Sequence, residues 1–482
     1  MGKMKQTYLI TGIILMHLLN TAFAQNPVIR DQFSADPTAR VFNGKVYLFP
    51  SHDIPAPDHK PMLKKWFCMA DYHVFSSENL MDWKDHGVIV SQDNVEWVDS
   101  TAYAMWAPDC IERNGKYYFY FPAVMKPQKN QDENAIRMSS IGVAIAEKPE
   151  GPYVAEPSYI RGVLGIDPGL FIDNDGQAYI YWTGSYLNVK PQQETSGGFR
   201  DSISEHGLIV SKLKDNMLEL EGKPRLIKEL PIKGLAEGPF LFERNGIYYF
   251  SYPHMENNVE RLEYAMGDNP MGPFIWKGVI MDESPVECWT VHHSILEYKG
   301  QWYLFYHQND YSPDFDKNRS VHIDSLFFNP DGTIKKVPRT RRGVGLTPAT
   351  SEIQIDRYSN VSSLGTSISF LNSDNTFEGW KTTFVGSNAW VQYNAVNIVD
   401  EIKTIELRLN SPRGGKLDIY TGEGGGFNPN ARTLIAEVNV PEAKDWSLVK
   451  APVSNLETGI KNLVIMNEGT GIVEVDWIRF EN

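Results

Sequence analysis

After its first 24 residues the chain is dominated by short runs in which apolar and polar positions alternate, and one such pattern recurs five times. Each copy is a polar turn with a glycine followed by an aromatic-rich run, as in Val41-Phe-Asn-Gly-Lys-Val-Tyr-Leu-Phe49 and Phe242-Glu-Arg-Asn-Gly-Ile-Tyr-Tyr-Phe250. Asn-Gly or Asp-Gly between alternating apolar residues is a strong β-hairpin signal, because type I′ turns need positive φ. The pattern predicts five equivalent hairpins, whose glycines are Gly44, Gly115, Gly176, Gly246 and Gly300.

The spacing of these glycines predicts the fold of the larger part of the chain. They are 71, 61, 70 and 54 residues apart, and a unit of that length holds about four strands, which is one propeller blade. No stretch after the first 24 residues shows sustained helical periodicity. The pattern therefore predicts an all-β protein with a five-bladed β-propeller over residues 25–346.

From residue 347 the repeat stops and a different arrangement of short strands begins. Alternating runs such as Thr404–Leu409, Lys416–Tyr420 and Val473–Phe480 follow one another, interrupted by a glycine-rich stretch after Gly422. Many short strands at about ten-residue spacing are typical of a β-sandwich. We expect a jelly-roll-like sandwich over residues 347–482.

The N-terminus has the features of a secretory signal peptide. Lys3 and Lys5 precede an apolar run over residues 8–19, and Ala22 and Ala24 supply small residues before a cut after Ala24. The apolar run is too short for a membrane span, and no later stretch is long enough either. Residues 1–24 are therefore predicted to be removed, leaving a secreted or periplasmic protein without a membrane span.

Composition narrows the choice of partners. Lys and Arg total 46 against 60 Asp and Glu, a net charge of −14, so an acidic chain that repels phosphates is not expected to bind nucleic acid. Aromatic residues make up 12% of the chain, and their flat faces suit stacking against sugar rings. The three cysteines (Cys68, Cys110 and Cys288) are too few and scattered for a disulfide framework or a zinc cluster.

Polar residues precede each repeated hairpin at nearly the same distance. They lie 8, 6, 9, 9 and 8 residues before the repeat glycine, so in a propeller they start the innermost strands and converge at one mouth of the channel. Single Asp-Pro or Glu-Gly-Pro sequences are usually turn residues, but several in phase indicate a site. The converging residues are Asp36, Asp109, Asp167, Glu237 and His292-His293.

Converging carboxylates repel one another and raise at least one pKa. Glycoside hydrolysis uses such an arrangement, with one carboxylate as the base and one protonated acid for the leaving oxygen.

Here the chain resembles glycoside hydrolase family 43. The resemblance rests on Ala35-Asp36-Pro37 with Ser51-His-Asp53, Met105-Trp-Ala-Pro-Asp109, Gly165-Ile-Asp167-Pro168 and Glu237-Gly-Pro239. It implies a five-bladed propeller acting on arabinose- and xylose-containing polysaccharides of the plant cell wall, with inversion at the anomeric carbon. By this resemblance Asp36 is the general base, Glu237 the general acid, and Asp167 orients the acid and raises its pKa. Base and acid would then stand about 6.5–9.5 Å apart.

The same resemblance suggests further site residues. His292 falls where relatives place a histidine beside a central cation, commonly Ca²⁺; a buried, hydrogen-bonded histidine is the alternative. Trp106 is a candidate wall for sugar stacking, and Asp53 and Arg319 are candidates for binding sugar hydroxyls, with a core tryptophan and a salt bridge as their alternatives. Tyr72-His73 and His307 are further hub-facing residues without an assigned role.

The C-terminal sandwich resembles family 6 carbohydrate-binding modules in Val475-Asp-Trp-Ile-Arg-Phe480 and around Trp390. Glu474 stands where many such modules have a ligand-binding Asn, so a sandwich that only packs on the propeller is an equal alternative. Trp446 is its best candidate for an exposed aromatic.

The leading hypothesis is a secreted inverting hydrolase that removes α-L-arabinofuranosyl or β-D-xylosyl units from xylan or arabinoxylan, with α-L-arabinofuranosidase favoured. A β-xylosidase, or an endo-acting xylanase or arabinanase, is the alternative within the family, and no organic cofactor is expected. An invertase-like propeller, suggested by Glu287-Cys288, lacks its N-terminal Asn-Asp-Pro-Asn-Gly segment here. A non-catalytic glycan-binding propeller would typically have lost one of the three acids.

Overall fold

The computed structural model describes residues 25–127, 138–188, 202–286, 288–422 and 432–482, and the regular secondary structure within them is almost all β-strand. The helices of this part are three short 3₁₀ turns, η1 (Pro61–Lys65), η2 (Gln92–Asn94) and η3 (Thr376–Glu378). The all-β prediction is confirmed. The expected signal peptide, residues 1–24, lies outside the described residues, and none of the helices described is long and apolar enough to cross a membrane.

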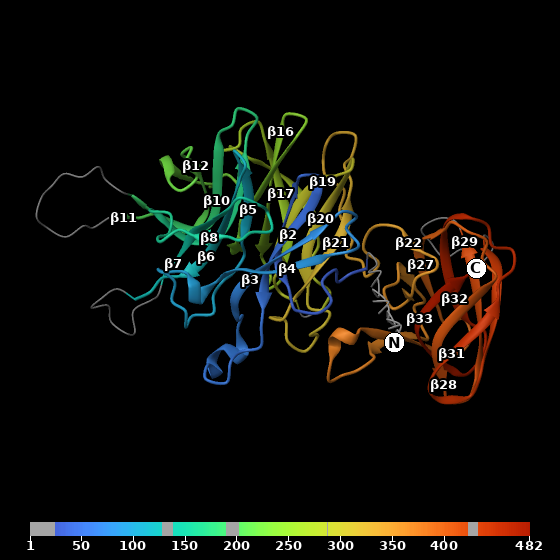
Figure 1. The fold of residues 1–482 in the computed structure, drawn as a ribbon. Helices are drawn as coiled ribbons and strands as arrows, with labels where there is room; N and C mark the ends of the chain where they lie inside the picture. Colours follow the sequence, from blue (N-terminus) through green and yellow to red (C-terminus); the bar gives the residue numbers. More distant parts are fainter. Residues whose placement is uncertain (1–24, 128–137, 189–201, 287, 423–431) are drawn as a thin grey trace, which may run out of the picture.

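Five antiparallel sheets form the propeller, which occupies the left of Figure 1. Each sheet is one blade, built mainly from consecutive strands, so the five-bladed prediction is confirmed. Blade 1 holds β1 (Ala35–Phe42), β2 (Lys45–Asp53), β3 (Met69–Ser77) and β4 (Lys84–Ser91); blade 2 holds β5 (Asp109–Arg113), β6 (Lys116–Val124), β7 (Ser139–Ala146) and β8 (Val154–Ala155); blade 3 holds β9 (Val163–Ile172), β10 (Ala178–Asn188), β11 (Ser202–Ile203), β12 (Gly207–Leu213) and β13 (Leu220–Leu226); blade 4 holds β14 (Leu235–Ala236), β15 (Phe240–Arg244), β16 (Ile247–Met255), β17 (Glu260–Gly267) and β18 (Ile275–Met281); blade 5 holds β19 (His293–Tyr298), β20 (Gln301–Gln308) and β21 (Ser320–Leu326).

The repeated glycines lie in the turns between the first two long strands of each blade. In blades 1, 2, 4 and 5 the turn has two residues, both at positive φ, as at Asn43 (51°) and Gly44 (77°). Blade 3 differs, because Ile172 pairs with Ala178 and leaves a five-residue loop in which only Gly176 has positive φ. The local turn chemistry therefore explains four of the five hairpins.

The inner strands of the five blades form a closed ring around the hub. β1 contacts β5, β5 contacts β9, β9 contacts β15, β15 contacts β19, and β19 contacts β1. The segment before β1 closes the ring further, because the Val28 N–H donates to the Val321 carbonyl at 2.9 Å and the Ser34 N–H to the Arg319 carbonyl at 2.8 Å. The start of the propeller is thus hydrogen-bonded to β21 of its last blade.

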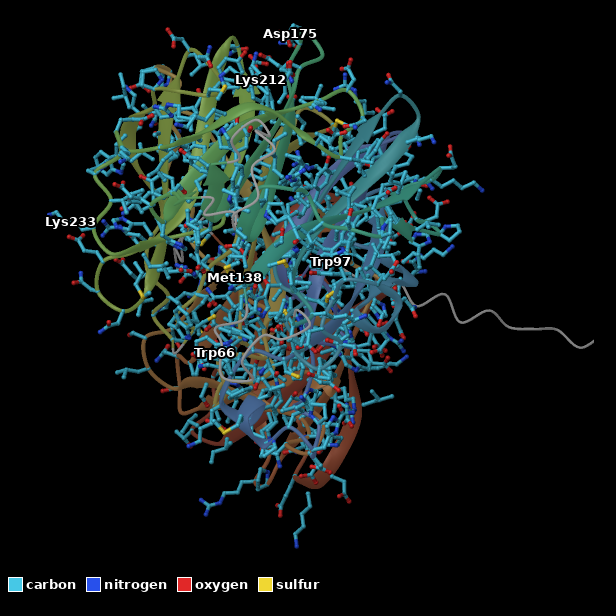
Figure 2. The ribbon with its side chains drawn as sticks, turned by 90° about the vertical axis from the view of Figure 1, so that its left-hand side faces the viewer. Trp66, Trp97, Met138, Asp175, Lys212 and Lys233 are labelled. Atoms are coloured by element: carbon cyan, nitrogen blue, oxygen red, sulfur yellow. The ribbon has the colours of Figure 1, made fainter. Side chains whose placement is uncertain are left out.

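Most large aromatic side chains lie between blades rather than in the channel. Trp182, Tyr120 and Tyr249 are fully buried, and pairs such as Tyr72–Phe119 pack edge to face at 5.1 Å. The aromatic content therefore mainly reflects packing, and only a few rings are left for a sugar. All three cysteines are buried free thiols, as expected. Charged residues such as Asp175 and Lys233 lie on the outside (Figure 2).

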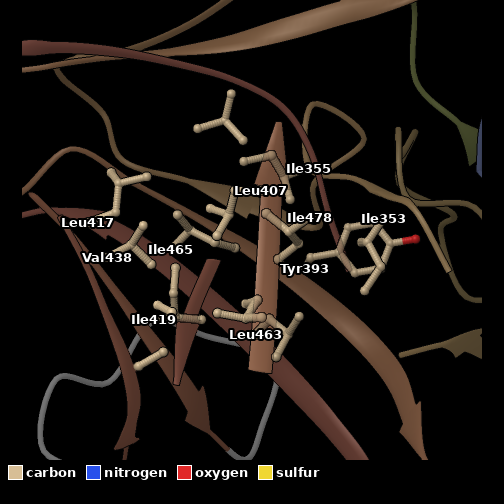
Figure 3. Packing of buried hydrophobic residues seen from close by; sticks show 14 of the residues in the cluster. Ile353, Ile355, Tyr393, Leu407, Leu417, Ile419, Val438, Leu463, Ile465 and Ile478 are labelled. Carbon is tan, nitrogen blue, oxygen red and sulfur yellow. The ribbon is translucent and has the colours of Figure 1, made fainter. Parts of the chain in front are cut away.

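The C-terminal domain is a sandwich of two sheets, on the right of Figure 1. Its interior is aliphatic, with Leu407, Ile419, Leu463 and Ile478 among the buried residues (Figure 3). One sheet holds β22 (Thr347–Pro348), β24 (Asn360–Val361), β27 (Trp390–Ile398), β29 (Gly415–Gly422), β30 (Arg432–Val440) and β32 (Gly459–Asn467), and the other holds β23 (Ile353–Gln354), β25 (Thr366–Phe370), β26 (Trp380–Val385), β28 (Thr404–Ser411), β31 (Ala443–Pro452) and β33 (Ile472–Glu481).

The two domains meet around one tryptophan of the sandwich. Trp380 stacks on Tyr311 of the propeller, with ring centroids 4.8 Å apart, and Arg341 and Arg357 lie over its ring. Gln25 also donates to the Tyr393 hydroxyl at 2.7 Å. The sandwich is therefore attached on the side of the propeller where its first and last segments meet.

Candidate active site

A pocket at the hub collects residues from four of the five blades. It encloses about 540 Å³ of empty space, its open mouth included, which is in the range of small-ligand pockets. All three predicted acids reach it. Its lining is Asp36, Trp66, Phe67, Met69, Trp106, Ala107, Ile166, Asp167, Glu237, Trp289, Thr290, His292 and Arg319.

Asp36 is held as an ionised carboxylate at one wall of this pocket. Arg319 donates from Nη1 to Oδ1 at 2.8 Å, and the Ser51 hydroxyl donates to Oδ2 at 2.8 Å. Burial raises the pKa of Asp36, but the charge of Arg319, with a smaller contribution from His307, outweighs it and lowers the pKa to about 2. Asp36 therefore carries a negative charge at any neutral or mildly acidic pH.

Asp53 does not reach the pocket, so its predicted role in binding sugar hydroxyls is not supported by its position. The side chain is buried, and both carboxylate oxygens accept hydrogen bonds from Arg319 at 2.8–2.9 Å. Arg319 lines the pocket as predicted, but its guanidinium is shared between Asp53 and Asp36. The salt-bridge alternative is thus the one observed, and Asp53 positions Arg319.

Asp167 and Glu237 form the opposite, uncompensated part of the site. The Gly238 N–H, directly after Glu237, donates to Asp167 Oδ2 at 3.1 Å. Burial and then the charges of Glu237 and Asp36 raise the pKa of Asp167 well above its usual value. Burial also raises the pKa of Glu237, to which the charge of Asp36 adds. One or more protons are therefore retained here at pH values where Asp36 is ionised.

Glu260, at the start of β17, is a fourth carboxyl that sequence reasoning missed. It is 1% exposed, its Oε2 accepts the Val291 N–H at 2.8 Å, and it is hydrogen-bonded to Glu237. Burial and the charge of Glu237 raise the pKa of Glu260 well above its usual value, and its hydrogen bond lowers the pKa of Glu237. Glu260 belongs to no repeated motif, so no spacing in the sequence could have identified it.

Three other supporting residues do share a position in the repeat. Ser51, Thr183 and His307 each lie seven residues after a repeat glycine, at the hub end of the second hairpin strand. Ser51 donates to Asp36, and the Thr183 hydroxyl is hydrogen-bonded to Asp167. Nδ1 of His307 accepts the Asp36 N–H at 3.1 Å. This equivalent spacing is the signal that would have found them.

The residue that precedes the proline of each acid motif also has the same backbone conformation in blades 1, 3 and 4. Asp36 and Asp167, each followed by proline, have φ of 46° and 54°, a left-handed conformation that is unfavourable for residues other than glycine. In blade 4, Gly238 has φ of 52°, and a Cβ there would approach the His292 ring to 2.8 Å. Strain of this kind persists where the surrounding contacts hold a side chain in place.

Asp109, the equivalent acid of blade 2, is not part of the pocket. It is 1% exposed, forms an ion pair with Arg40, and accepts the Leu170 N–H at 2.6 Å. It joins blades 1, 2 and 3. His73 also points away from the hub, because it alternates along β3 with the buried Tyr72, whose hydroxyl donates to the Trp106 carbonyl.

His292 lines the pocket, but its hydrogen bonding does not match a direct calcium ligand. Its Nδ1 accepts the His293 N–H at 2.9 Å, so the neutral ring carries its proton on Nε2. Burial lowers the pKa of His292 to about 4, which keeps the ring neutral. Among the described residues, Nε2 of His292 has no hydrogen-bond partner, which leaves this donor to a group that enters the pocket. Ca²⁺ prefers oxygen ligands, so no catalytic step is assigned to a metal, and calcium at the hub stays a prediction.

Aromatic rings form the remaining walls. Trp106 lines the pocket as predicted, and Trp66, Phe67 and Trp289 were not anticipated. Trp66 is 49% exposed and follows η1 in the loop between β2 and β3 (Figure 2). Phe67 lies under the guanidinium of Arg319 at 4.6 Å and near Trp289. These rings offer apolar faces for a sugar. Glu287, from the invertase-like alternative, lies outside the described residues.

The site therefore combines an ionised carboxylate, a protonated carboxyl cluster and aromatic walls on a five-bladed propeller. Residues 24–334 match the family described as glycosyl hydrolases family 43, and the chain belongs to that family.

Some relatives match about the length of the propeller, and others match nearly the whole chain. The chain is 36% identical to a xylosidase/arabinosidase 43A of Humicola insolens, over 64% of this chain and 98% of the relative. It is 26% identical to an arabinoxylan arabinofuranohydrolase of Bacillus subtilis, over 97% of this chain and 93% of the relative.

Solved structures agree on the fold. A family 43 β-xylosidase/α-arabinofuranosidase from a compost metagenome, in a calcium-free complex with xylotriose, matches at 33% identity with a TM-score of 0.54, covering 66% of this chain and 98% of that one. The structure of the Bacillus subtilis arabinoxylan arabinofuranohydrolase matches at 21% identity with a TM-score of 0.51, covering 96% of this chain and 99% of that one. This second match supports the fold of both domains.

Two residues of the sandwich bear on glycan binding: Glu474, which replaces the usual ligand-binding Asn, and Trp446, the candidate exposed aromatic; both have contacts within the domain. Glu474 forms an ion pair with Lys381 and accepts from Asn410. Trp446 is half-buried with the Arg408 guanidinium over its ring. The resemblance to family 6 modules stays a prediction.

Proposed function

We propose that the protein is an inverting, exo-acting glycosidase that removes α-L-arabinofuranosyl and β-D-xylosyl units from xylan or arabinoxylan, with arabinofuranosyl preferred. The observation that carries the proposal is the different surroundings of the carboxyl groups at one pocket. Arg319 and Ser51 hold Asp36 and its pKa is lowered, whereas Asp167, Glu237 and the neighbouring Glu260 are buried together and their pKa values are raised. Separated acid and base carboxyls are what glycoside hydrolysis requires.

In this mechanism Asp36 is the general base. Its carboxylate takes a proton from a water molecule that attacks the anomeric carbon, and Arg319 and Ser51 hold the carboxylate in place. The low pKa makes Asp36 a weak base, but one that stays ionised under all conditions in which the enzyme would act.

Glu237 is the general acid in the same scheme. It donates its proton to the departing glycosidic oxygen, and the resulting carboxylate accepts the hydrogen bond from Glu260. Asp167 holds the Glu237 segment through the Gly238 N–H. The sugar stacks on Trp106, and His292 Nε2 donates to one of its hydroxyls.

The choice of sugar draws on the relatives. Those at 35–36% identity are named xylosidase/arabinosidase or β-xylosidase, which supports pentosyl substrates. The relative that spans both domains is named arabinoxylan arabinofuranohydrolase, which supports the arabinofuranosyl preference. The predicted signal peptide supports a secreted or periplasmic location, where such polymers are met.

The test compares aryl α-L-arabinofuranoside and aryl β-D-xyloside with intact arabinoxylan. We expect aryl release from both, faster from the arabinofuranoside, and pentose released from the polymer. The first product, observed by proton NMR before mutarotation, should have the inverted anomeric configuration. Cleavage of polymer chains without aryl release would support the endo-acting alternative, and binding without any hydrolysis would support the non-catalytic propeller.

A further inference from the structure

Blade 1 carries a cluster of histidine and carboxylate side chains outside the pocket. His52 on β2 and Asp71 and His73 on β3 each offer one nitrogen or oxygen atom, and these three atoms lie within 4.8 Å of one another. Strand alternation separates them from the hub, because the neighbouring Ser51 faces Asp36 and Tyr72 is buried. The cluster therefore has no part in the proposed reaction.

The local strand geometry brings the two imidazoles together. The pairing of β2 with β3 is irregular between Ser51 and Asp53, where His52 lies. The pairing of β3 with β4 is irregular on both sides of His73. Irregularities of this kind redirect side chains, and here the two rings approach edge to face with centroids 5.1 Å apart.

One of the two imidazoles is already oriented by a carboxylate outside the proposed ligand set. His73 Nδ1 lies 3.0 and 3.1 Å from the two oxygens of Asp85 on β4, which leaves Nε2 of His73 available. His52 Nδ1 lies 2.7 Å from Asp71 Oδ1. Histidines that bind metals commonly have their other ring nitrogen on a carboxylate, as His73 does on Asp85. For His52, Nδ1 would itself be the ligand atom, next to Asp71 Oδ1.

The charge balance of the cluster differs from that of the hub. Asp36 and Asp53 are compensated by Arg319. Within the described part of the chain, the ion-pair partners of Asp71 and Asp85 are the histidines alone. When the two histidines are neutral, Asp71 and Asp85 give the cluster two negative charges. These side chains are only partly exposed to solvent, so binding of a divalent cation would be favoured as compensation for the charges.

We propose that His52, Asp71 and His73 bind one divalent transition-metal ion, of which Zn²⁺ is the representative. Two imidazoles and one carboxylate are ligands that Zn²⁺ accepts in tetrahedral sites, with water in the fourth position. Mg²⁺ and Ca²⁺ are disfavoured because they select oxygen ligands. Tetrahedral zinc bonds of about 2.0–2.2 Å place ligand atoms about 3.4 Å apart. His52 Nδ1 and Asp71 Oδ1 stand 2.7 Å apart and all three atoms lie within 4.8 Å of one another, so the change needed is within reach of side-chain rotation.

Such an ion would join β2 to β3 next to the residues that order the base. Ser51 and Asp53 flank His52, and they hold Asp36 and Arg319 respectively. The ion therefore acts as a structural clamp, and its binding to the folded state alone would stabilise the protein.

The test uses the chain without its first 24 residues, treated with chelator and titrated with Zn²⁺ by calorimetry. We expect one equivalent to bind and to raise the melting temperature. His52→Gln and His73→Gln should each lose this equivalent, whereas His206→Gln, an exposed histidine of blade 3, should keep it. Asp85→Asn should weaken binding by about 10–100-fold, because it removes only the carboxylate behind His73.

Co²⁺ provides a second readout that does not depend on stability. The wild-type protein should develop the visible absorption of a four-coordinate Co²⁺, and both glutamine variants should lose it while keeping the metal-free melting temperature. Equal Zn²⁺ binding by wild type, His52→Gln and His73→Gln would place the ion elsewhere and overturn the proposal. So would the absence of binding to the wild-type protein at about 0.1 mM Zn²⁺.

Discussion

The two sides of the pocket are made of the same kind of group, yet they hold protons differently. On one side Asp36 has a guanidinium, a hydroxyl and a histidine ring around it, and its pKa falls to about 2. On the other side Asp167, Glu237 and Glu260 lie close to one another, and all three pKa values are raised. Burial acts in the same direction on every one of these carboxyls, so the difference comes from the partners.

This comparison shows how one pocket can provide a base and an acid at the same pH. Arg319, placed on the Asp36 side, makes the largest contribution that lowers the pKa of Asp36, and His307, His292 and Ser51 add to it. Asp53 keeps that cation in place from behind. The following predictions test the two sides in turn.

Replacing Asp36 by asparagine should have the largest effect. The change is nearly isosteric and keeps a partner for Ser51, so we expect the fold to remain and turnover to fall by at least about 10²–10⁴-fold. Hydrolysis of aryl glycosides measures turnover, and a thermal melt measures whether the fold remains. A variant that keeps more than a tenth of the wild-type rate would remove Asp36 from the base role.

Replacing Glu237 by glutamine should have an effect that depends on the leaving group. Natural arabinoxylan linkages, which depart as sugar alkoxides unless protonated, should be cleaved far more slowly, by about 10²–10⁴-fold. Dinitrophenyl glycosides, whose phenolate leaves without a proton, should be slowed much less. Asp36→Asn is the matched control, since it should slow both substrates alike. Equal slowing by Glu237→Gln would contradict the proton-donor role.

Asp167→Asn should lower the upper pH limit of activity. The charge of Asp167 and the charge of Glu237 each disfavour ionisation of the other. The pair loses its protons in two steps, and the charge left by the first step keeps the second proton on the pair. With asparagine at position 167 Glu237 titrates without that charge beside it, so its pKa falls and the protonated acid is lost at a lower pH. The pH dependence of kcat/KM should show its basic limb moved down. An unchanged limb would mean that Asp167 only orients the acid.

Glu260 should act in the opposite direction. Its hydrogen bond lowers the pKa of Glu237, so Glu260→Leu should raise that pKa and move the basic limb of kcat/KM upward. Glu260→Gln is the control, because its amide can still donate to Glu237 and accept from the Val291 N–H. If both variants shifted the limb equally, the charge of Glu260 rather than its hydrogen bond would be responsible.

Asp53→Asn should have the smallest effect of the five. Asp53 contacts Arg319 and is not among the residues that line the pocket, so kcat should fall by about tenfold or less as Arg319 loses one carboxylate partner, and KM should stay near the wild-type value. A residue that binds sugar hydroxyls would instead raise KM. Steady-state kinetics on the arabinofuranoside distinguishes the two.

Much of the propeller was predictable because its signals are local. An Asn-Gly pair favours the positive φ that a type I′ turn requires, so the turns at Gly44, Gly115 and Gly246 could be identified without knowledge of the fold. The three acids were found because the blade repeat imposes equivalent positions. Ser51, Thr183 and His307 obey the same repeat one strand further on.

The residues that pair with each carboxyl could not be predicted from the repeat in this way. Asp36 and Asp109 occupy nearly the same place in their blades, but one faces the pocket and the other is paired with Arg40. Arg319, the residue before β21, is 283 residues away from Asp36 in the sequence. Such pairings depend on which side chains meet across blades, and no local pattern records them.

The sequence by itself thus determined the strands, the turns, the five blades and the three converging acids, because each follows from alternation, turn chemistry or periodic spacing. Only the tertiary structure decided which acid is ionised, that Asp53 supports Arg319, that Glu260 stands behind Glu237, and that His52, Asp71 and His73 form a cluster of their own. The physical reason is that protonation depends on burial and on charges within a few ångströms. Those distances exist only once the blades have closed into a ring.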